Sequence, residues 1–325
     1  MKRLKFHFLN VGRGDCTIIE FPSGRIGMVD IDNLRALDPD TTAEMLAEYR
    51  QSAVYSRARS LGIEHFLEQK FLEEQEEKLT DPLAYLDANI SGDEIFRLLI
   101  THPDMDHMTG LHRLHEQSPK AISNFWHTGF HDFNLATTAD YAWGPYDKRD
   151  WETYKKLRAG GGWKSLQKYK GDTGDFWTED GVEIWAPTPE LEELAVEKDL
   201  ANIVSMVLKI SYKGRAVVLG GDATATETWP AIYPYIDMKS ISVLKASHHG
   251  RKTGYFGPAV KEMAPWLTIT SVGEAEHDAT QNYRRYSNYT VSLRKAGDIT
   301  VEIQEDGKWY YSPDLAEHWK PKLTE

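Results

Sequence analysis

Residues 100–111 read Ile-Thr-His-Pro-Asp-Met-Asp-His-Met-Thr-Gly-Leu, and they place two histidines and two aspartates within six positions. The apolar run at 95–100 predicts a buried strand that leads into this stretch, and a helix is expected to begin at Gly110-Leu111. Alternate residues of an extended or turning loop point the same way, so the loop between the two elements can gather its polar side chains. Those side chains are His102, Asp104, Asp106 and His107. Imidazole and carboxylate groups at this density favour a metal site over a solvated polar loop.

The spacing His-x-Asp-x-Asp-His resembles the first metal motif of the metallo-β-lactamase superfamily, which is usually His-x-His-x-Asp-His. Asp104 stands where the second histidine of that motif is expected. This departure is similar to the soluble domain of the ComEC family of DNA-internalisation competence proteins. Residues 10–15, Asn-Val-Gly-Arg-Gly-Asp, look like the Asp-Val-Gly-Gln-Gly-Asp-Ala segment that opens that domain, with departures at Asn10, Arg13 and Cys16. The resemblance implies an α/β fold, a four-layer αββα sandwich with the metal cleft along one edge.

Two later motifs extend the resemblance in the expected order. Residues 216–219 predict a strand that runs into Gly220-Gly221-Asp222, and in this superfamily an aspartate at that place bridges two metal ions. Residues 240–246 predict another strand, which is followed by His248-His249-Gly250, similar to the last metal motif. His249, which precedes the glycine, is the better candidate for a ligand. His248 is expected to contact substrate, protonate a leaving group or complete the first site, and the reverse assignment of the two histidines stays open.

One feature of the superfamily is missing. Asn202-x-x-Ser205 resembles the Asn-x-x-Ser-x-Val segment of the ComEC-like domain, but residues 186–205 contain no histidine, so the usual third histidine of the first metal site is absent. The first site is therefore expected to be the weaker of the two. The implied ligands are His102, Asp104, Asp106, His107, Asp222 and His249.

This ligand set indicates a reaction class. Its three carboxylates shift the preference from zinc toward manganese, and we expect two divalent ions, zinc or manganese, as cofactors. Two ions that share a bridging aspartate lower the pKa of a shared water and so supply a bridging hydroxide for hydrolysis. A phosphodiester suits the site because its two nonbridging oxygens can engage both ions. We expect a metal-dependent hydrolase, a phosphodiesterase or nuclease, with Asp106, His248 and Lys252 as catalytic residues.

Two alternatives remain open. A hydrolase of lactams, lactones or thioesters would use the same fold, but those branches usually keep the histidine-rich motif from which Asp104 departs. A non-catalytic or partner-activated module would keep the fold for binding. In that case the helical insertion expected at about residues 34–90, where 66–78 carries one apolar face, would dock a protein partner. Otherwise these helices brace the sandwich.

Composition sets broader bounds. The chain has 325 residues, 41% of them hydrophobic, which favours one domain over residues 1–325. A formal net charge of -12 excludes a broad basic surface for nucleic acid but leaves room for a local patch. No apolar run approaches the roughly 18 residues of a membrane span, and the first residues show no signal core, so we expect a cytoplasmic chain without a membrane partner. The single cysteine, Cys16, lies in an apolar run and is expected to be buried.

Three weaker expectations concern the remaining chain. The aromatic and lysine-rich run at 130–178 is expected to overhang the metal cleft. His127 and His131 are further candidates for the edge of the cleft, and residues 289–295 are expected to form a short helix.

Overall fold

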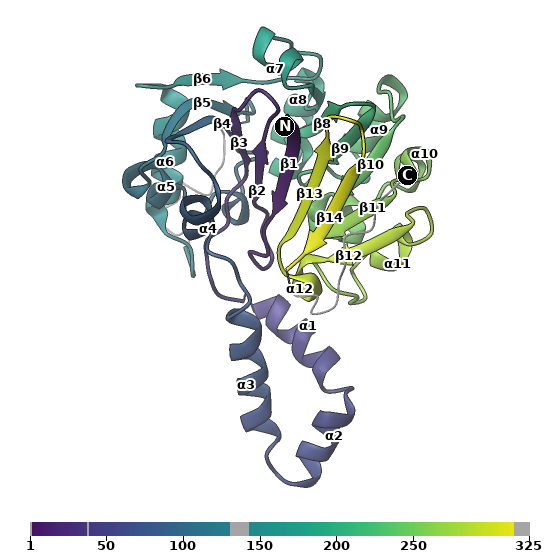
Figure 1. Ribbon diagram of the computed structural model, residues 1–325. Helices are drawn as coiled ribbons and strands as arrows, with labels where there is room; N and C mark the ends of the chain where they lie inside the picture. The colour runs from purple at the N-terminus through teal and green to yellow at the C-terminus, as the bar shows by residue number, and fades with distance from the viewer. Residues whose placement is uncertain (1, 38, 131–142, 315–325) are drawn as a thin grey trace.

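Two mixed β-sheets form the body of the molecule (Figure 1), and the computed structural model describes residues 2–37, 39–130 and 143–314. In spatial order, the larger sheet contains β14 (Trp309–Pro313), β13 (Ile299–Gln304), β1 (Arg3–Phe8), β2 (Thr17–Glu20), β3 (Ile26–Val29), β4 (Glu94–Leu99), β5 (Ala121–His127) and β6 (Lys164–Gln167). The smaller sheet contains β12 (Tyr289–Ser292), β11 (Leu267–Thr270), β10 (Ile241–Lys245), β9 (Arg215–Leu219), β8 (Val207–Tyr212) and β7 (Val182–Ala186).

Each sheet has an antiparallel part and a parallel part. In the larger sheet the strands from β14 to β3 pair antiparallel, and those from β3 to β6 pair parallel. In the smaller sheet β12 to β9 pair parallel, and β9 to β7 pair antiparallel. Parallel strands have their carboxyl ends at one edge of a sheet, and the loops that leave those ends form the usual ligand crevice of α/β proteins.

Most of the described helices pack around the two sheets, and the first three project from the body (Figure 1). The helices are α1 (Pro39–Tyr49), α2 (Ala53–Ser60), α3 (Glu64–Glu76), α4 (Pro82–Asn89), α5 (Leu111–Gln117), α6 (Lys148–Ala159), α7 (Asp175–Glu179), α8 (Pro189–Lys198), α9 (Thr228–Ile232), α10 (Gly257–Met263), α11 (Thr280–Tyr283) and α12 (Leu293–Ala296). Among the described residues, no helix is both long enough and apolar enough to span a membrane.

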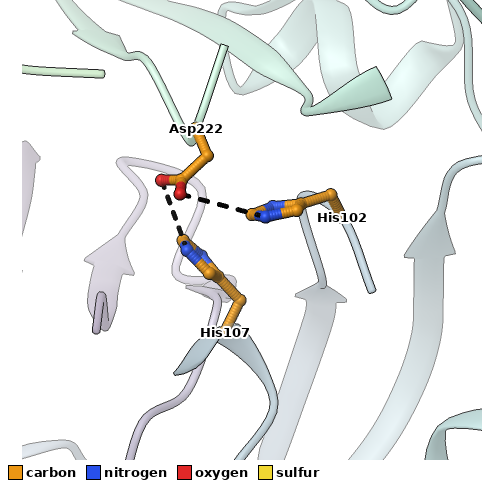
Figure 2. A group of neighbouring side chains, drawn as sticks. All are labelled: His102, His107 and Asp222. Carbon is orange, nitrogen blue, oxygen red and sulfur yellow. Dashed lines mark ion pairs between the residues drawn. The ribbon is translucent and has the colours of Figure 1, made fainter. Parts of the chain in front are cut away.

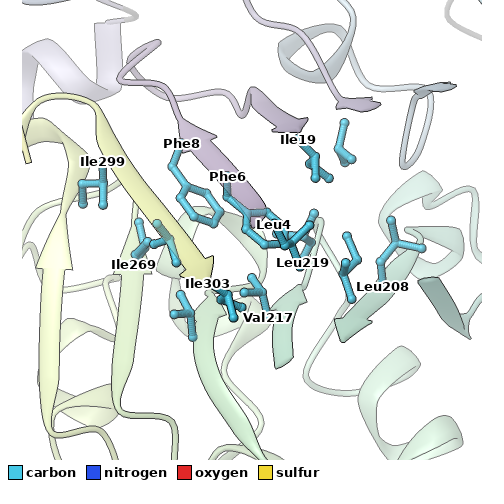
Figure 3. Close-up of a cluster of buried hydrophobic side chains, with 14 of the residues drawn as sticks. Leu4, Phe6, Phe8, Ile19, Leu208, Val217, Leu219, Ile269, Ile299 and Ile303 are labelled. Carbon is cyan, nitrogen blue, oxygen red and sulfur yellow. The ribbon is translucent and has the colours of Figure 1, made fainter. Parts of the chain in front are cut away.

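Buried side chains define the layers. The strand β13 alternates buried and half-buried residues, so that one of its faces enters the core between the sheets. That core holds Phe6 and Ile303 from the larger sheet and Val217 and Ile269 from the smaller one (Figure 3). A second apolar cluster joins the smaller sheet to α8, α9 and α10, and a third joins the larger sheet to α4, α5 and α6. The order is therefore helix, sheet, sheet, helix, a mixed α/β arrangement compatible with the expected αββα sandwich.

The helices α1, α2 and α3 project from the body, and we call residues 39–76 the helical arm (Figure 1). At its base, the Glu44 carboxylate lies 2.9 Å from Arg251 and 3.5 Å from Arg294. At its far end, Val54, Leu61, Ile63 and Phe66 are exposed by 62%, 64%, 44% and 66%, so the tip presents apolar side chains to solvent.

Two local expectations have clear outcomes. Cys16 is buried, as its apolar surroundings predicted. The helix expected at 289–295 is only partly correct, because its first half forms the strand β12 and the helical turn α12 covers Leu293–Ala296. Tyr289 to Ser292 pair in parallel with β11, and this tertiary contact outweighs the local helical pattern.

Candidate metal centre

The polar side chains of the candidate centre follow the carboxyl ends of strands in both sheets. Asp30 comes directly after β3, the His102–His107 loop after β4, Asp222 after β9, and His249 after β10. Because the two sheets pack face to face, these loops converge at one edge of the sandwich. Three overlapping groups of ligand atoms within 4.8 Å of one another result: His102, His107 and Asp222; Asp106, His107 and His249; Asp15, Asp222 and His249.

Asp222 occupies the middle of this arrangement. Figure 2 shows that His102 and His107 point toward different oxygens of its carboxylate, with His102 Nε2 3.9 Å from Oδ2 and His107 Nε2 3.3 Å from Oδ1. The backbone N–H of Asp222 donates to Ser205 Oγ at 2.7 Å, which fixes the turn that carries the carboxylate. A carboxylate that offers one oxygen to each of two imidazoles can serve two ions at once.

A buried hydrogen-bond network orients the histidine rings. His107 Nδ1 donates to Asp30 Oδ2 at 2.9 Å, so its Nε2 faces the centre. Asp30 also accepts from the backbone N–H of Thr101 at 2.7 Å and from its hydroxyl at 2.9 Å. The same hydroxyl lies 3.1 Å from His102 Nδ1, so the Nε2 atom of His102 is likewise directed inward. Carboxylate partners of this kind fix the tautomer and orientation of metal-binding histidines.

His249 completes the inner group. Its Nε2 lies 3.3 Å from Asp106 Oδ2 and 3.4 Å from Asp222 Oδ2, and its side chain is buried. His248 is more exposed; its Nε2 lies 3.6 Å from Asp222 Oδ2, and its Nδ1 lies 3.0 Å from Thr253 Oγ1. Both histidines have positive φ, 51° and 60°. An extended segment would point their side chains apart, whereas this left-handed turn brings both within ion-pair range of Asp222.

Two of the sequence-predicted residues stand apart from these groups. Asp104 Oδ2 lies 3.2 Å from His102 Nε2, but Asp104 belongs to none of the three groups found among the described residues. Lys252 is exposed on the turn that follows the histidine pair. Its neighbour Arg251 binds Glu44 of the helical arm and Asp278, so its charge is already engaged.

Asn202 occupies the region where the missing histidine was expected. Its side-chain amide lies 3.3 Å from Asp222 Oδ2 and 3.5 Å from His102 Nε2. Asn202 was noted in the sequence only as part of a resembling segment. Its amide therefore lies beside His102 and Asp222, in the region where a histidine was expected.

The pKa shifts in the centre show that its buried carboxylates and imidazoles stabilise one another's charged forms. Burial opposes ionisation of Asp222, but His249 and His107 outweigh it and hold the pKa of Asp222 well below its usual value. Burial likewise opposes the charged form of His107, but Asp222 and Asp30 raise its pKa well above the usual value. Three buried atoms, His107 Nε2, Asp222 Oδ1 and His249 Nε2, make no hydrogen bond within the described part of the chain. Buried polar atoms are almost always paired, so these three fit a divalent ion.

Sequence reasoning missed several residues of the centre. Asp15 and Asp30 are buried beside the ligands, and Lys245, the last residue of β10, reaches Asp15. Asp30 ends an apolar run and Asp15 ends the glycine-rich segment, so their position after strands or turns was a usable signal. Nothing local marks Lys245, which lies 230 positions from its partner.

Two parts of the aromatic run, 161–164 and 174–177, lie away from this centre, so the expected overhang was wrong for these residues. Phe96, Trp163, Phe176 and Trp177 line a hollow of about 630 Å³ together with Glu94, the first residue of β4. The candidate ligands follow the other end of that strand. His127 also lies elsewhere and contacts Thr128 and Ser165, whereas His131 falls outside the described residues.

The comparisons with known proteins add little. No protein-family model matches the chain, and no curated protein matches it. Among solved structures, a mutant of CmlA beta-hydroxylase is similar over 92% of this chain and 54% of that chain, with 11% sequence identity and a TM-score of 0.44. This chain thus spans about half of the length of that structure. A likeness at this level supports neither a fold nor a function, and the functional argument therefore comes from the centre itself.

Proposed function

We propose that the chain is a metal-dependent hydrolase of the metallo-β-lactamase superfamily that cleaves phosphodiesters, in the manner of a ComEC-like phosphodiesterase or nuclease. The observation that carries this proposal is the Asp222 carboxylate, whose two oxygens face different histidines at a buried strand-end crevice. The proposed ligands are His102, Asp106, His107, Asp222 and His249, and Asp104 lies beside His102 to complete the first site.

The charge balance of the crevice supports metal ions. Asp15, Asp30, Asp32 and Asp222 are buried, and the partly buried Asp106 lies beside them. Lys245 supplies one positive charge, and isolated buried carboxylates are costly unless they are paired or coordinate a metal. The oxygen-rich donor set favours manganese or a similar hard ion, whereas cysteine-rich sites favour softer metal ions.

Each residue of the crevice has its own proposed role. Asp222 and Asp106 would hold the ions together with His107 and His249, and Asp30 keeps His107 directed inward. Bound ions would supply Lewis acidity and a water of lowered pKa. His248, a partly exposed residue with its ring beside Thr253, would exchange a proton with the leaving oxygen.

Arg13 is a further candidate cation for substrate charge, in addition to Lys252. Its guanidinium lies 3.9 Å from Asp106 and 3.7 Å from Asp40 on the helical arm, and its side chain is 38% exposed. It therefore stands at the rim of the crevice beside a proposed ligand, where a phosphoryl oxygen would arrive.

The test compares substrates and metals in one assay. Purified chain, stripped with chelator and reloaded with manganese, zinc or no metal, is given a chromogenic phosphodiester, a lactam and a lactone. Phosphodiester cleavage is expected with manganese, and His107→Gln should reduce it to the metal-free background. His127→Gln is the matched control, because His127 is also a buried histidine but contacts Thr128 and Ser165 away from the centre.

The other outcomes select the alternatives. Turnover of the lactam or lactone without turnover of the phosphodiester would overturn the proposal in favour of a hydrolase of lactams, lactones or thioesters. Bound metal with no turnover of any substrate would favour a binding module that a partner activates.

A further inference from the structure

A buried ion pair lies next to the candidate metal centre and has no place in the ligand set. Lys245 Nζ donates to Asp15 Oδ1 at 2.5 Å and to Ser271 Oγ at 3.0 Å. The Ser271 hydroxyl in turn donates to the same Asp15 oxygen at 2.8 Å. All three side chains are buried, and they come from three separate strand ends or turns.

This pair faces the outer side of His249. The Nδ1 atom of His249 lies 3.6 Å from Asp15 Oδ1, whereas its Nε2 atom faces Asp106 and Asp222. The arrangement repeats that of His107, whose Nδ1 meets Asp30 and whose Nε2 faces Asp222. The distance to Asp15 exceeds that of a hydrogen bond, but hydrogen bonds of functional sites are often long without their ligand and tighten when it binds.

We infer that Asp15 is a positioning residue for His249 and not a metal ligand, and that Lys245 and Ser271 hold its carboxylate in place for that task. The inference rests on the proposed metal centre. Asp15 lies within ligand distance of Asp222 and His249, so direct coordination is the competing role. The Oδ1 atom that faces His249 already accepts from Lys245 and Ser271, and a metal ion on that oxygen would meet the lysine's positive charge at close range.

The pairing with Lys245 also makes Asp15 differ in effective charge from Asp30, the carboxylate beside His107. The Asp30 carboxylate accepts from neutral Thr101 and from His107, so its negative charge acts on the His107 ring. The Asp15 charge is largely compensated by Lys245. His249 should therefore be a weaker electron donor than His107.

The experiment removes the pair without leaving a lone buried charge. Breaking one partner of a buried ion pair destabilises the fold, whereas replacing both by neutral groups of similar size is often tolerated. Asp15→Asn/Lys245→Met is therefore the test variant. Arg97→Met/Asp180→Asn is the matched control, since Arg97 and Asp180 form another buried pair, 3.2 Å apart, which contacts none of the proposed ligands. Arg25 also pairs with Asp180, but it keeps Glu179 as a partner in this variant.

Manganese affinity and stoichiometry are measured on the full chain, with thermal unfolding of the metal-free protein as a check of folding. The test variant should bind manganese about 10- to 100-fold more weakly, the usual cost of losing a partner of a metal-binding histidine, while the control should be unchanged. His249→Ala should then weaken binding much less in the test variant than in the natural sequence, because Asp15 acts through His249.

Other outcomes would overturn the inference or separate it from the proposed function. Unchanged manganese affinity in a folded test variant would reduce the pair to a structural contact. Effects of the pair and of His249→Ala that simply add would make Asp15 an independent ligand. If the natural sequence binds manganese but cleaves no phosphodiester, the proposed function fails and the inference stands; if it binds no divalent ion, both fail.

Discussion

The two adjacent histidines after β10 show how backbone conformation decides roles at the scale of single residues. Positive φ angles at His248 and His249 turn both rings toward Asp222, but only His249 is buried among Asp106 and Asp222. His249→Ala is expected to lose metal affinity. His248→Ala is expected to keep metal and lose rate by roughly 10²- to 10⁴-fold, the usual contribution of a general acid or base.

Metal analysis and kinetics on the same samples separate the two roles. Metal loss in His248→Ala with retention in His249→Ala would reverse the assignment. Loss in both would mean that His248 supplies coordination to the first site, where Asn202 stands in place of a histidine.

Asp32 makes a second residue-scale prediction, which concerns pH. Burial, followed by the nearby Asp106 charge, raises the pKa of Asp32 from 3.8 to about 8. The folded chain then holds this proton more tightly than the unfolded chain, so the stabilising contribution is full below pH 3.8 and is lost as the pH rises toward 8. In chelator-treated protein, Asp32→Asn should therefore flatten the fall in unfolding free energy between about pH 4 and pH 8.

Urea unfolding across that pH range measures the effect. The amide keeps the Oδ1 acceptor that receives the backbone N–H of Leu34 at 3.1 Å, so local geometry is retained. A pH slope identical to that of the natural sequence would show that Asp32 is ionised throughout.

At the scale of elements, the helical arm is tied to the turn that carries the histidine pair. Glu44 of α1 lies between Arg251, directly after that turn, and Arg294 of α12, and its side chain is only 9% exposed. Glu44→Gln leaves two largely buried arginines without this carboxylate and should cost about 3 kcal/mol, near the lower end for a broken buried pair, because Asp278 still accompanies Arg251.

Glu74→Gln, which breaks the exposed pair with Lys70 on α3, is the control and should cost less than about 0.5 kcal/mol. Equal costs for the two substitutions, measured by denaturant unfolding, would mean that the base of the arm is no anchor.

Most strands could be placed from the sequence because their apolar runs are bounded by glycine and proline turns. The run at 95–100 corresponds to β4, Glu94–Leu99, and the predicted run at 216–219 to β9, Arg215–Leu219. The strand β12 was not predicted, because a four-residue segment takes its conformation from β11 beside it. Local patterns identify elements, but partners far apart in the chain decide ambiguous ones.

At the scale of the whole molecule, contacts between distant parts of the chain also limit how much of the metal centre can be predicted from the sequence. His102, His107, Asp222 and His249 could be named because each belongs to a short motif with recognisable spacing. Lys245 and Asp15 meet across 230 positions, and the contact exists only because both sheets end at one edge. Motifs therefore reveal ligands, whereas the residues that orient them depend on the completed fold.

The exposed tip of the helical arm has a consequence for limited proteolysis. Leu61 and Phe66 lie at the turn between α2 and α3, and leucine and aromatic side chains are preferred by proteases of chymotrypsin type. Cleavage is expected there first, because exposed loop tips open most readily. The two fragments should stay together, since β1–β3 of the first pair with β4 and β13 of the second. Mass spectrometry of the nicked species after gel filtration would detect this, and separation of the fragments would contradict it.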